Sequence, residues 1–375
     1  MVKMLYQVDN RCPVRLQYLY DLSTSAVNAV TVCTGTPWQE VVRLLMEQAR
    51  LRACMPTYVT CVTDMMRVSG FASLPRVKNA EELLAVCGEE ETEAEWFIAK
   101  TASLGYCALT RLPGGDGFQM HGLRPGGRGY PGMSFDSCWV YVPGSDNRTG
   151  IKRTSFVMPG VTAPHKALAV TNMNPQDHNV GDCSVRALCA ALECTWEEAI
   201  DLLAGANRYT DPVINTTFNI NNALIGLSFE RHRAIVRNGR RLTGKQFCDQ
   251  MTYTFHNGER IFAFVGRSHC AAVLPFREED GTVRYKTQDT WDSTDKAIGD
   301  YWVIPPRERR ERLSPPARAE TVSCGEVGVG SVITHPKYGR GTVTAENGGV
   351  LTVAFENAGE KKLSAAWLKK QCGRG

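Results

Sequence analysis

The sequence lacks the long apolar segments that would place a protein in a membrane or direct it out of the cell. No apolar run among its 375 residues reaches the roughly 18–20 residues that a transmembrane helix needs. The first segment, MVKMLYQVDNRC, has no apolar core of the kind found in signal peptides. The formal net charge of +4 is too small to indicate a nucleic-acid partner. We therefore expect a cytoplasmic protein with no membrane partner and no nucleic-acid partner.

Metal and nucleotide motifs are also absent. The chain has 14 cysteines but no CxxC pair, so a structural zinc site is not expected. The cysteines are scattered through apolar stretches, and Cys107, Cys189 and Cys270 are interpreted as small buried apolar residues of a protein in a reducing compartment. The glycine-rich segment 112–132 lacks the Lys-Ser/Thr of a phosphate-binding loop. We expect no metal and no other cofactor.

The distribution of proline and charge divides the chain. Residues 305–320 are rich in proline and charge without an apolar period, which predicts a linker over 306–325. Beyond it, residues 326–375 show short alternating apolar segments separated by glycine-containing turns, a pattern that favours a small all-β barrel.

An internal repeat occupies the first 305 residues. With Trp38 aligned on Trp196, residues 25–45 match residues 183–203, and both copies open a second helix after a threonine that predicts a capping box. Shorter matches follow in the same order, 105–112 with 268–275 and 137–143 with 299–305. The repeat predicts an α+β fold with two domains of one architecture, residues 1–145 and 146–305.

Cys183 is the candidate nucleophile. It follows Asp182 and begins an apolar-periodic helix, whose unpaired N–H groups favour a thiolate. His269, at the start of an apolar strand, is the candidate base, and Asp289, after the next strand, is the candidate to orient the imidazole. A core cysteine and a buried core histidine are the alternative interpretations. Two further aspartates compete with Asp289 for the third role: Asp292 and Asp295.

Several neighbouring residues complete the predicted site. Gln176 and Asn179 are the candidate side-chain donors for an oxyanion hole, with Gln176 preferred. Trp291 is expected to shield the triad from water. The basic segment 231–241 is interpreted as a solvated hairpin, with binding of an acidic substrate as the alternative.

The first copy lacks this chemistry in the alignment. Ser25 stands at the position of Cys183 and Tyr106 at that of His269, and no aspartate stands at the position of Asp289. Because a serine without a base is a poor nucleophile, residues 1–145 are predicted to form a non-catalytic domain.

The blocks Asp182–Leu188, His269–Val273 and Asp289–Asp292 carry a resemblance. Through them, residues 174–305 resemble papain-like cysteine peptidases, in particular small phage and bacterial proteins and viral leader proteinases. The resemblance implies a helical lobe against an antiparallel sheet, and hydrolysis of peptide or isopeptide bonds without a cofactor. It also implies a protein substrate, which in a virus- or phage-encoded enzyme would be its own polyprotein or a protein in the host cytoplasm.

Residues 327–372 contain HPKYGRGTV followed by LTVAFENAGEKKL. This segment resembles the Tudor/SH3-like barrel at the C-terminus of UvrD/PcrA-type helicases. The resemblance implies a docking module for a protein partner.

Two other functions remain open at the level of the sequence. The same Cys-His-Asp set supports a deamidase or transglutaminase, because those reactions share the thioester intermediate. A catalytically idle adaptor, built from two inactive copies and a docking barrel, is the alternative outside enzymes.

Overall fold

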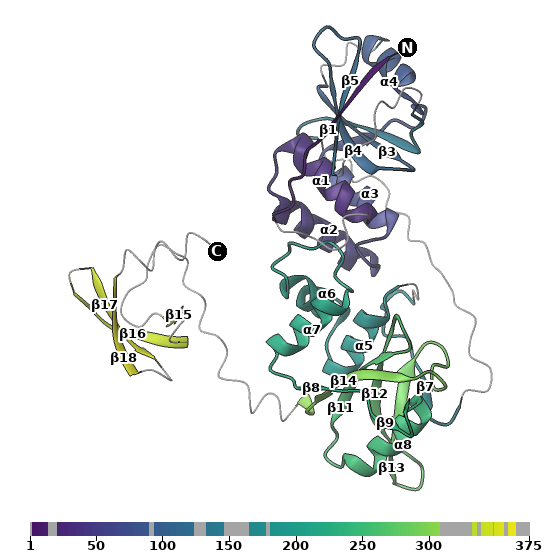
Figure 1. Ribbon diagram of the computed structural model, residues 1–375, viewed down its shortest axis with the longest axis vertical. Helices are drawn as coiled ribbons and strands as arrows, with labels where there is room; N and C mark the ends of the chain where they lie inside the picture. Colours follow the sequence, from purple (N-terminus) through teal and green to yellow (C-terminus); the bar gives the residue numbers. More distant parts are fainter. Residues whose placement is uncertain are drawn as a thin grey trace. The chain divides into compact units, whose positions relative to one another are not determined.

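The computed structural model shows a mixed α+β protein that divides into two compact units, Met1–Arg307 and Glu308–Gly375 (Figure 1). The boundary falls inside the predicted linker. No helix within the described ranges is long and apolar enough to cross a bilayer. The residues that the structure describes are 2–13, 21–89, 94–123, 133–145, 165–177, 181–307, 332–335, 339–347, 349–355 and 359–364.

The first unit contains two lobes, and the first lobe is a six-stranded sheet covered by helices. Its strand order is β1-β5-β4-β3-β6-β2, in which β1 is parallel to β5 and the other pairs are antiparallel. In chain order the elements are β1 (Lys3–Val8), α1 (Leu22–Thr34), α2 (Trp38–Arg52), α3 (Val59–Val68), β2 (Phe71–Ser73), α4 (Ala80–Glu89), β3 (Trp96–Thr101), β4 (Gly105–Arg111), β5 (Gly117–Gly122) and β6 (Ser137–Tyr141).

The second lobe has the order β7-β13-β12-β11-β14-β8, again with one parallel pair, β7 with β13, at the edge. Its elements are β7 (Leu168–Val170), α5 (Cys183–Leu192), α6 (Trp196–Gly205), α7 (Thr217–Gly226), β8 (Arg231–His232), β9 (Val236–Arg237), β10 (Arg240–Arg241), α8 (Gly244–Thr254), β11 (Arg260–Val265), β12 (His269–Arg277), β13 (Val283–Asp289) and β14 (Ile298–Ile304).

The two lobes share one topology. A strand, three helices, an edge strand, a fourth helix and four strands follow in the same order in each, and equivalent strands occupy equivalent places in the two sheets. The difference is the short hairpin β9–β10, which is inserted between β8 and α8 of the second lobe. The common topology supports the internal repeat that the sequence indicates.

Helix boundaries follow local capping chemistry. The capping box that begins α6 is confirmed: the Thr195 N–H donates to Glu198 Oε2 at 2.7 Å, and the Glu198 N–H donates to Thr195 Oγ1 at 3.2 Å. The prediction of an equivalent capping box in the first copy is wrong. There α2 begins after Pro37 without a side-chain cap, because the Thr36 hydroxyl is bonded to the Thr34 hydroxyl instead.

Helices α1–α3 of the first lobe and α5–α7 of the second pack against each other and share one apolar core (Figure 1). Helices α4 and α8 cover the other faces of the two sheets. Trp38, at the start of α2, donates its indole N–H to the Thr210 carbonyl oxygen at 2.9 Å. Nearby, Arg50 forms an ion pair with Asp201 at 2.9 Å. The first lobe is therefore part of the structural support of the second.

The second unit is a four-stranded antiparallel sheet. Its strands pair in chain order: β15 (Val332–His335), β16 (Gly339–Asn347), β17 (Val350–Phe355) and β18 (Gly359–Ser364). Val343, Leu351 and Val353 form its buried apolar side. Pairing of β15 with β18, which would close a barrel, is not found among the described residues of this unit.

Candidate active site

The nucleophile candidate lies at the start of a helix that packs on the sheet. Cys183 is the first residue of α5, and this helix lies against β12, the strand that carries His269. The first N–H groups of a helix have no intrahelical acceptor, so they form a positive end at the thiol. The sequence prediction of a cysteine at a helix N-terminus agrees with this placement, and the residue is half-buried.

His269 and Asp289 lie on adjacent antiparallel strands, β12 and β13. The His269 Nε2 is 2.6 Å from Asp289 Oδ2. The His269 imidazole is also hydrogen-bonded to the Cys183 thiol. Because the carboxylate engages Nε2, the ring nitrogen that faces the thiol is Nδ1. The structure thus brings the three sequence-predicted residues together as a connected chain of side chains.

The electrostatics of the pair favour a thiolate and an imidazolium. The Cys270 thiol hydrogen-bonds to Cys183 and, with the His269 hydrogen bond and charge, lowers the pKa of Cys183 to about 4 against the effect of burial. For His269, burial acts to lower the pKa. The hydrogen bonds and charges of the Asp289 carboxylate and the Cys183 thiolate outweigh burial and raise the pKa of His269 to about 9. The ion pair is therefore the favoured state between these values.

Asp289 is the aspartate that faces His269. Its side chain is buried, and its oxygens also accept from the Ser293 hydroxyl at 2.8 Å and from the Thr290 N–H at 2.8 Å. The competing aspartates have other partners: Asp292 Oδ1 accepts from Thr294, and Asp295 is paired with Lys245 at 2.7 Å.

A buried polar network, which the sequence reasoning missed, supports this chain of side chains. Arg186 donates from Nε to Asp182 Oδ1 at 2.9 Å and from Nη1 to Thr290 Oγ1 at 2.9 Å, and Nη1 lies 3.8 Å from Asp289 Oδ1. Asn174 donates to Asp182 Oδ2 at 3.1 Å. The i, i+4 spacing of Asp182 and Arg186 across the helix start was the available signal for the first of these contacts.

The network extends to the first lobe. The Asn174 side-chain amide also donates to the Ala53 carbonyl oxygen, at 2.7 Å. Ala53 ends α2 with a φ of 47°, in the left-handed region. The position of Asp182, and through it that of Arg186, therefore depends in part on the end of a helix in the first lobe.

The oxyanion candidates are less well placed. The Gln176 amide donates to the Leu51 carbonyl oxygen at 3.4 Å, and no hydrogen bond between Gln176 and Cys183 is found among the described residues. Asn179 lies outside those residues. The backbone N–H of Cys183, at the helix start, is the donor that the geometry supplies. The Asn215 side chain carries a further amide and, like Cys183, lines a cavity of the second lobe.

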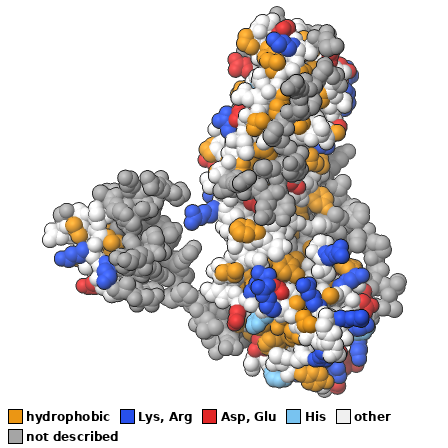
Figure 2. Space-filling model, in the orientation of Figure 1, with side chains coloured by type: hydrophobic (Ala, Val, Ile, Leu, Met, Phe, Trp, Pro, Cys, Tyr) orange, Lys and Arg blue, Asp and Glu red, His pale blue; other side chains and the backbone are white. Residues whose placement is uncertain are grey.

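A cavity of about 610 Å³ opens beside Cys183 and His269. Lys and Arg side chains gather on the face of the second lobe that Figure 2 shows. Trp291 packs edge-on against the His269 imidazole, with ring centroids 5.1 Å apart. This contact is the one expected of a residue that shields the imidazole from water.

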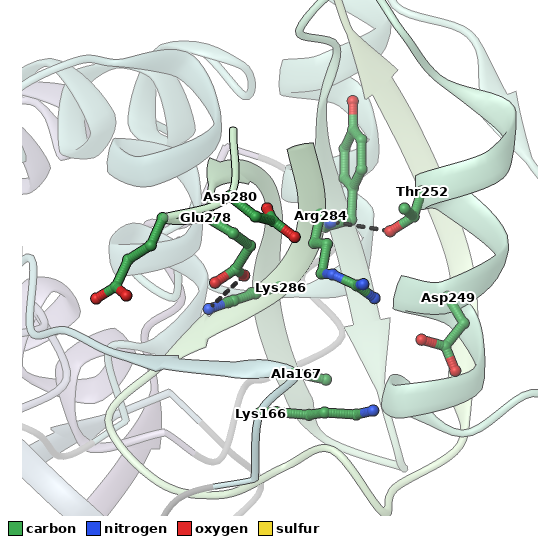
Figure 3. A pocket seen from close by; sticks show the side chains of 10 residues that line it. Lys166, Ala167, Asp249, Thr252, Glu278, Asp280, Arg284 and Lys286 are labelled. Carbon is green, nitrogen blue, oxygen red and sulfur yellow. Dashed lines mark hydrogen bonds and ion pairs between the residues drawn. The ribbon is translucent and has the colours of Figure 1, made fainter. Parts of the chain in front are cut away.

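A second cavity, of about 530 Å³, lies at the opposite ends of β12 and β13 and contains none of the three candidate residues (Figure 3). Its lining mixes both signs of charge, and Lys286 is paired with Glu278 at 2.9 Å. Tyr285 donates its backbone N–H to Thr252 Oγ1 at 2.9 Å. No cysteine or histidine is among its lining residues, so the candidate site is the cavity beside Cys183.

Strand register changes the alignment of the two copies. In the first lobe Ile98 pairs with Ala108, and in the second Phe262 pairs with Ala272, which places Tyr106 at the position of Cys270. The Tyr106 N–H donates to Ser25 Oγ at 3.1 Å. Cys270 makes the matching backbone hydrogen bond to Cys183. The prediction that Tyr106 stands at the position of His269 is therefore wrong by one residue.

Glycines replace both partners of the nucleophile in the first lobe. The same register puts Gly105 at the position of His269 and Gly122 at that of Asp289. A Cβ on Gly105 would lie 2.6 Å from Ser25 Oγ, so this position does face the serine. Beside Gly122, the Tyr6 hydroxyl occupies the space that a side chain would need.

No cluster of three or more His, Cys, Asp or Glu side chains suited to a metal ion occurs within the described part of the chain. Comparisons of the chain with protein-family models, curated proteins and solved structures gave no match.

Proposed function

We propose that the chain is a cysteine peptidase, in which the second lobe is a papain-like catalytic domain that uses Cys183, His269 and Asp289. The observation that carries the proposal is the connected set of contacts from the Cys183 thiol through His269 to Asp289, 2.6 Å from the imidazole. The three side chains come from α5, β12 and β13, so the fold, and no local segment, assembles them.

The reaction would run by acyl transfer. The Cys183 thiolate attacks the carbonyl carbon, and the helix-start N–H of Cys183 donates to the oxygen that becomes negative. The His269 imidazolium then gives its Nδ1 proton to the leaving amine, which leaves a thioester on Cys183. Neutral His269 takes a proton from water as the water attacks the thioester, and collapse releases the acid and restores the thiolate. Asp289 holds the imidazole by Nε2 throughout.

The remaining parts are assigned supporting roles. The first lobe is a non-catalytic papain-like copy, since Ser25 has glycines where a base and its orienting carboxylate would be. The second unit is a Tudor/SH3-like module that docks a protein partner. A tandem with one inactive copy suits a virus- or phage-encoded enzyme that processes its own polyprotein or a host protein.

The test compares cleaved proteins in cells that express the intact chain or the Cys183→Ala chain. New N-termini, mapped by mass spectrometry, should appear with the intact chain and be absent with Cys183→Ala. Alanine is a good helix residue at this site, so the fold should be retained, and circular dichroism checks this. Equal sets of N-termini from the two chains would overturn the peptidase. Conversion of glutamine to glutamate without new N-termini would assign the same thioester chemistry to a deamidase.

The adaptor is the alternative that the geometry favours least. A lobe that served only as a binding surface would have no need for a buried Arg186 held between Asp182 and Asp289, because burying three charges is costly unless each one is paired. The first lobe, where glycines stand at the positions of His269 and Asp289, meets the description of an adaptor better.

A further inference from the structure

Arginine side chains dominate the charge of the cavity beside Cys183. Among the lining residues of this cavity, the single carboxylate is that of Asp300. Four arginines line the same cavity, so the lining has an excess of three positive charges when Cys183 and His269 are left out of the sum. The arginines are Arg231, Arg233, Arg241 and Arg267.

The carboxylate does not neutralise them. Asp300 Oδ2 accepts from Arg231, at 3.0 Å from Nε and 2.6 Å from Nη2, and from Arg233 Nη1 at 3.2 Å, so two cations share one anion. The Arg231 guanidinium also lies over the Trp302 ring, 5.6 Å from its centroid, which holds it in place. Arg241 and Arg267 have no ion pair with any described residue.

The arginines reach the cavity from three separate segments. Arg231 begins the edge strand β8, Arg241 ends the hairpin strand β10, and Arg267 lies in the turn that leads directly to His269. The hairpin β9–β10 is the insertion that the first lobe lacks. The positive charge is thus specific to the second lobe and is concentrated around the cavity beside Cys183. A solvated hairpin alone would not explain this concentration of charge.

We propose that this cavity binds an acidic peptide segment, with Asp or Glu side chains within a few residues of the bond that Cys183 attacks. Guanidinium groups bind carboxylates through paired hydrogen bonds, and two of the four arginines are open to do so. That a peptide bond beside the acidic residues is cleaved rests on the proposed function. The preference for acidic side chains rests on the cavity alone.

A peptide fits the cavity better than a nucleic acid does. A volume of about 610 Å³ accommodates a few side chains, and Phe264 is the one aromatic residue, apart from His269, among its lining residues. Binding of single-stranded nucleic acid relies on several aromatic faces that stack the bases. The arginines here surround a nucleophile and offer no such series of stacking faces.

The first experiment measures binding without catalysis. The full chain with Cys183→Ala is titrated against two fluorescein-labelled octapeptides, one rich in Glu and one with Gln at the same positions, by fluorescence anisotropy. The Glu peptide should bind more tightly, and Arg241→Gln and Arg267→Gln should each weaken it roughly two- to fivefold. Arg240→Gln is the matched control, since Arg240 lies on the same strand but outside the cavity lining, and it should change nothing.

Two results of this experiment would overturn the proposal. Equal binding of the Glu and Gln peptides would remove the charge preference. A single-stranded oligonucleotide that binds more tightly than the Glu peptide, and loses affinity in the same two variants, would assign the cavity to nucleic acid.

The second experiment measures cleavage of a peptide library made from a digested proteome. Asp and Glu should be enriched near the cleaved bonds, and the double variant Arg241→Gln/Arg267→Gln should lose most of that enrichment. Cys183-dependent cleavage without acidic enrichment would overturn the inference and leave the peptidase intact. Arginine-dependent binding of the Glu peptide without Cys183-dependent cleavage would support the inference and count against the peptidase.

Discussion

Alkylation of Cys183 should depend on pH in a way that an ordinary thiol does not show. The pKa of Cys183 is about 4 and that of His269 about 9, so the thiolate is present over the whole range between them. The alkylation rate should therefore be nearly level from about pH 5 to pH 8, whereas the rate of an ordinary thiol rises about tenfold per pH unit below its pKa. His269→Ala removes the cation, so its Cys183 should titrate at a higher pH.

The size of the effect follows from two opposing quantities. At pH 5, a thiol with a pKa of about 4 has roughly 10⁴ times the thiolate fraction of one at 9.0. The more acidic thiolate is also the weaker nucleophile, by roughly 100- to 300-fold over five pKa units. Cys183 should therefore react about 30 to 100 times faster than an ordinary exposed thiol at pH 5, and lose this advantage near pH 7.

The assay labels the intact chain with limiting iodoacetamide from pH 3.5 to 9 and follows the adduct on the Cys183 peptide by mass spectrometry. In His269→Ala, most of the labelling at pH 5 should disappear. A second variant, Cys270→Ala, measures how much of the lowered pKa comes from the neighbouring thiol. A wild-type rate that climbs tenfold per pH unit between pH 5 and pH 8 would refute the thiolate–imidazolium pair.

Three further predictions concern the supporting residues. Asp289→Asn should reduce kcat/KM for a cleaved peptide less than His269→Ala does, because an amide can still orient the ring; a greater loss in Asp289→Asn would contradict this. Arg186→Met should lower the free energy of unfolding by about 3–5 kcal/mol, since it leaves the buried Asp182 carboxylate unpaired, and Arg186→Lys should lower it less. Urea unfolding of the full chain measures both variants. Unfolding midpoints equal to that of the wild type would count against the network. Ser25→Cys should create no thiol that iodoacetamide labels preferentially at pH 5, because no imidazole faces it; rapid labelling there would show that a helix N-terminus suffices.

The catalytic candidates could be predicted because their signals are local. An apolar-periodic helix that starts at Cys183 and an apolar strand that starts at His269 are both visible within about ten residues of sequence. The structure begins α5 and β12 at these residues. The order Cys, His, Asp then needs only a hairpin between β12 and β13 to bring Asp289 to the imidazole, and such short antiparallel connections are common.

The supporting network could not be predicted in the same way. Asp182 precedes a helix, which in a sequence indicates an N-cap, but its side chain makes no cap and binds Arg186 and Asn174 instead. The Ala53 carbonyl that holds Asn174 is 121 positions away in the chain. Burial decides this arrangement, because a buried guanidinium must find carboxylates wherever the fold brings them.

Strand register was the other limit, and it matters most for the first lobe. The apolar segments of two strands can be aligned almost equally well with a slip of one residue, yet such a slip exchanges the two faces of a strand. Backbone pairing removes the ambiguity: the residue that faces Ser25 from the position of His269 is Gly105, not Tyr106. With Gly122 at the place of Asp289, the first lobe keeps the backbone path of the candidate site without its histidine and aspartate side chains. Its Ala53 carbonyl oxygen still accepts a hydrogen bond from Asn174, so the first lobe contributes to the support of the candidate site in the second.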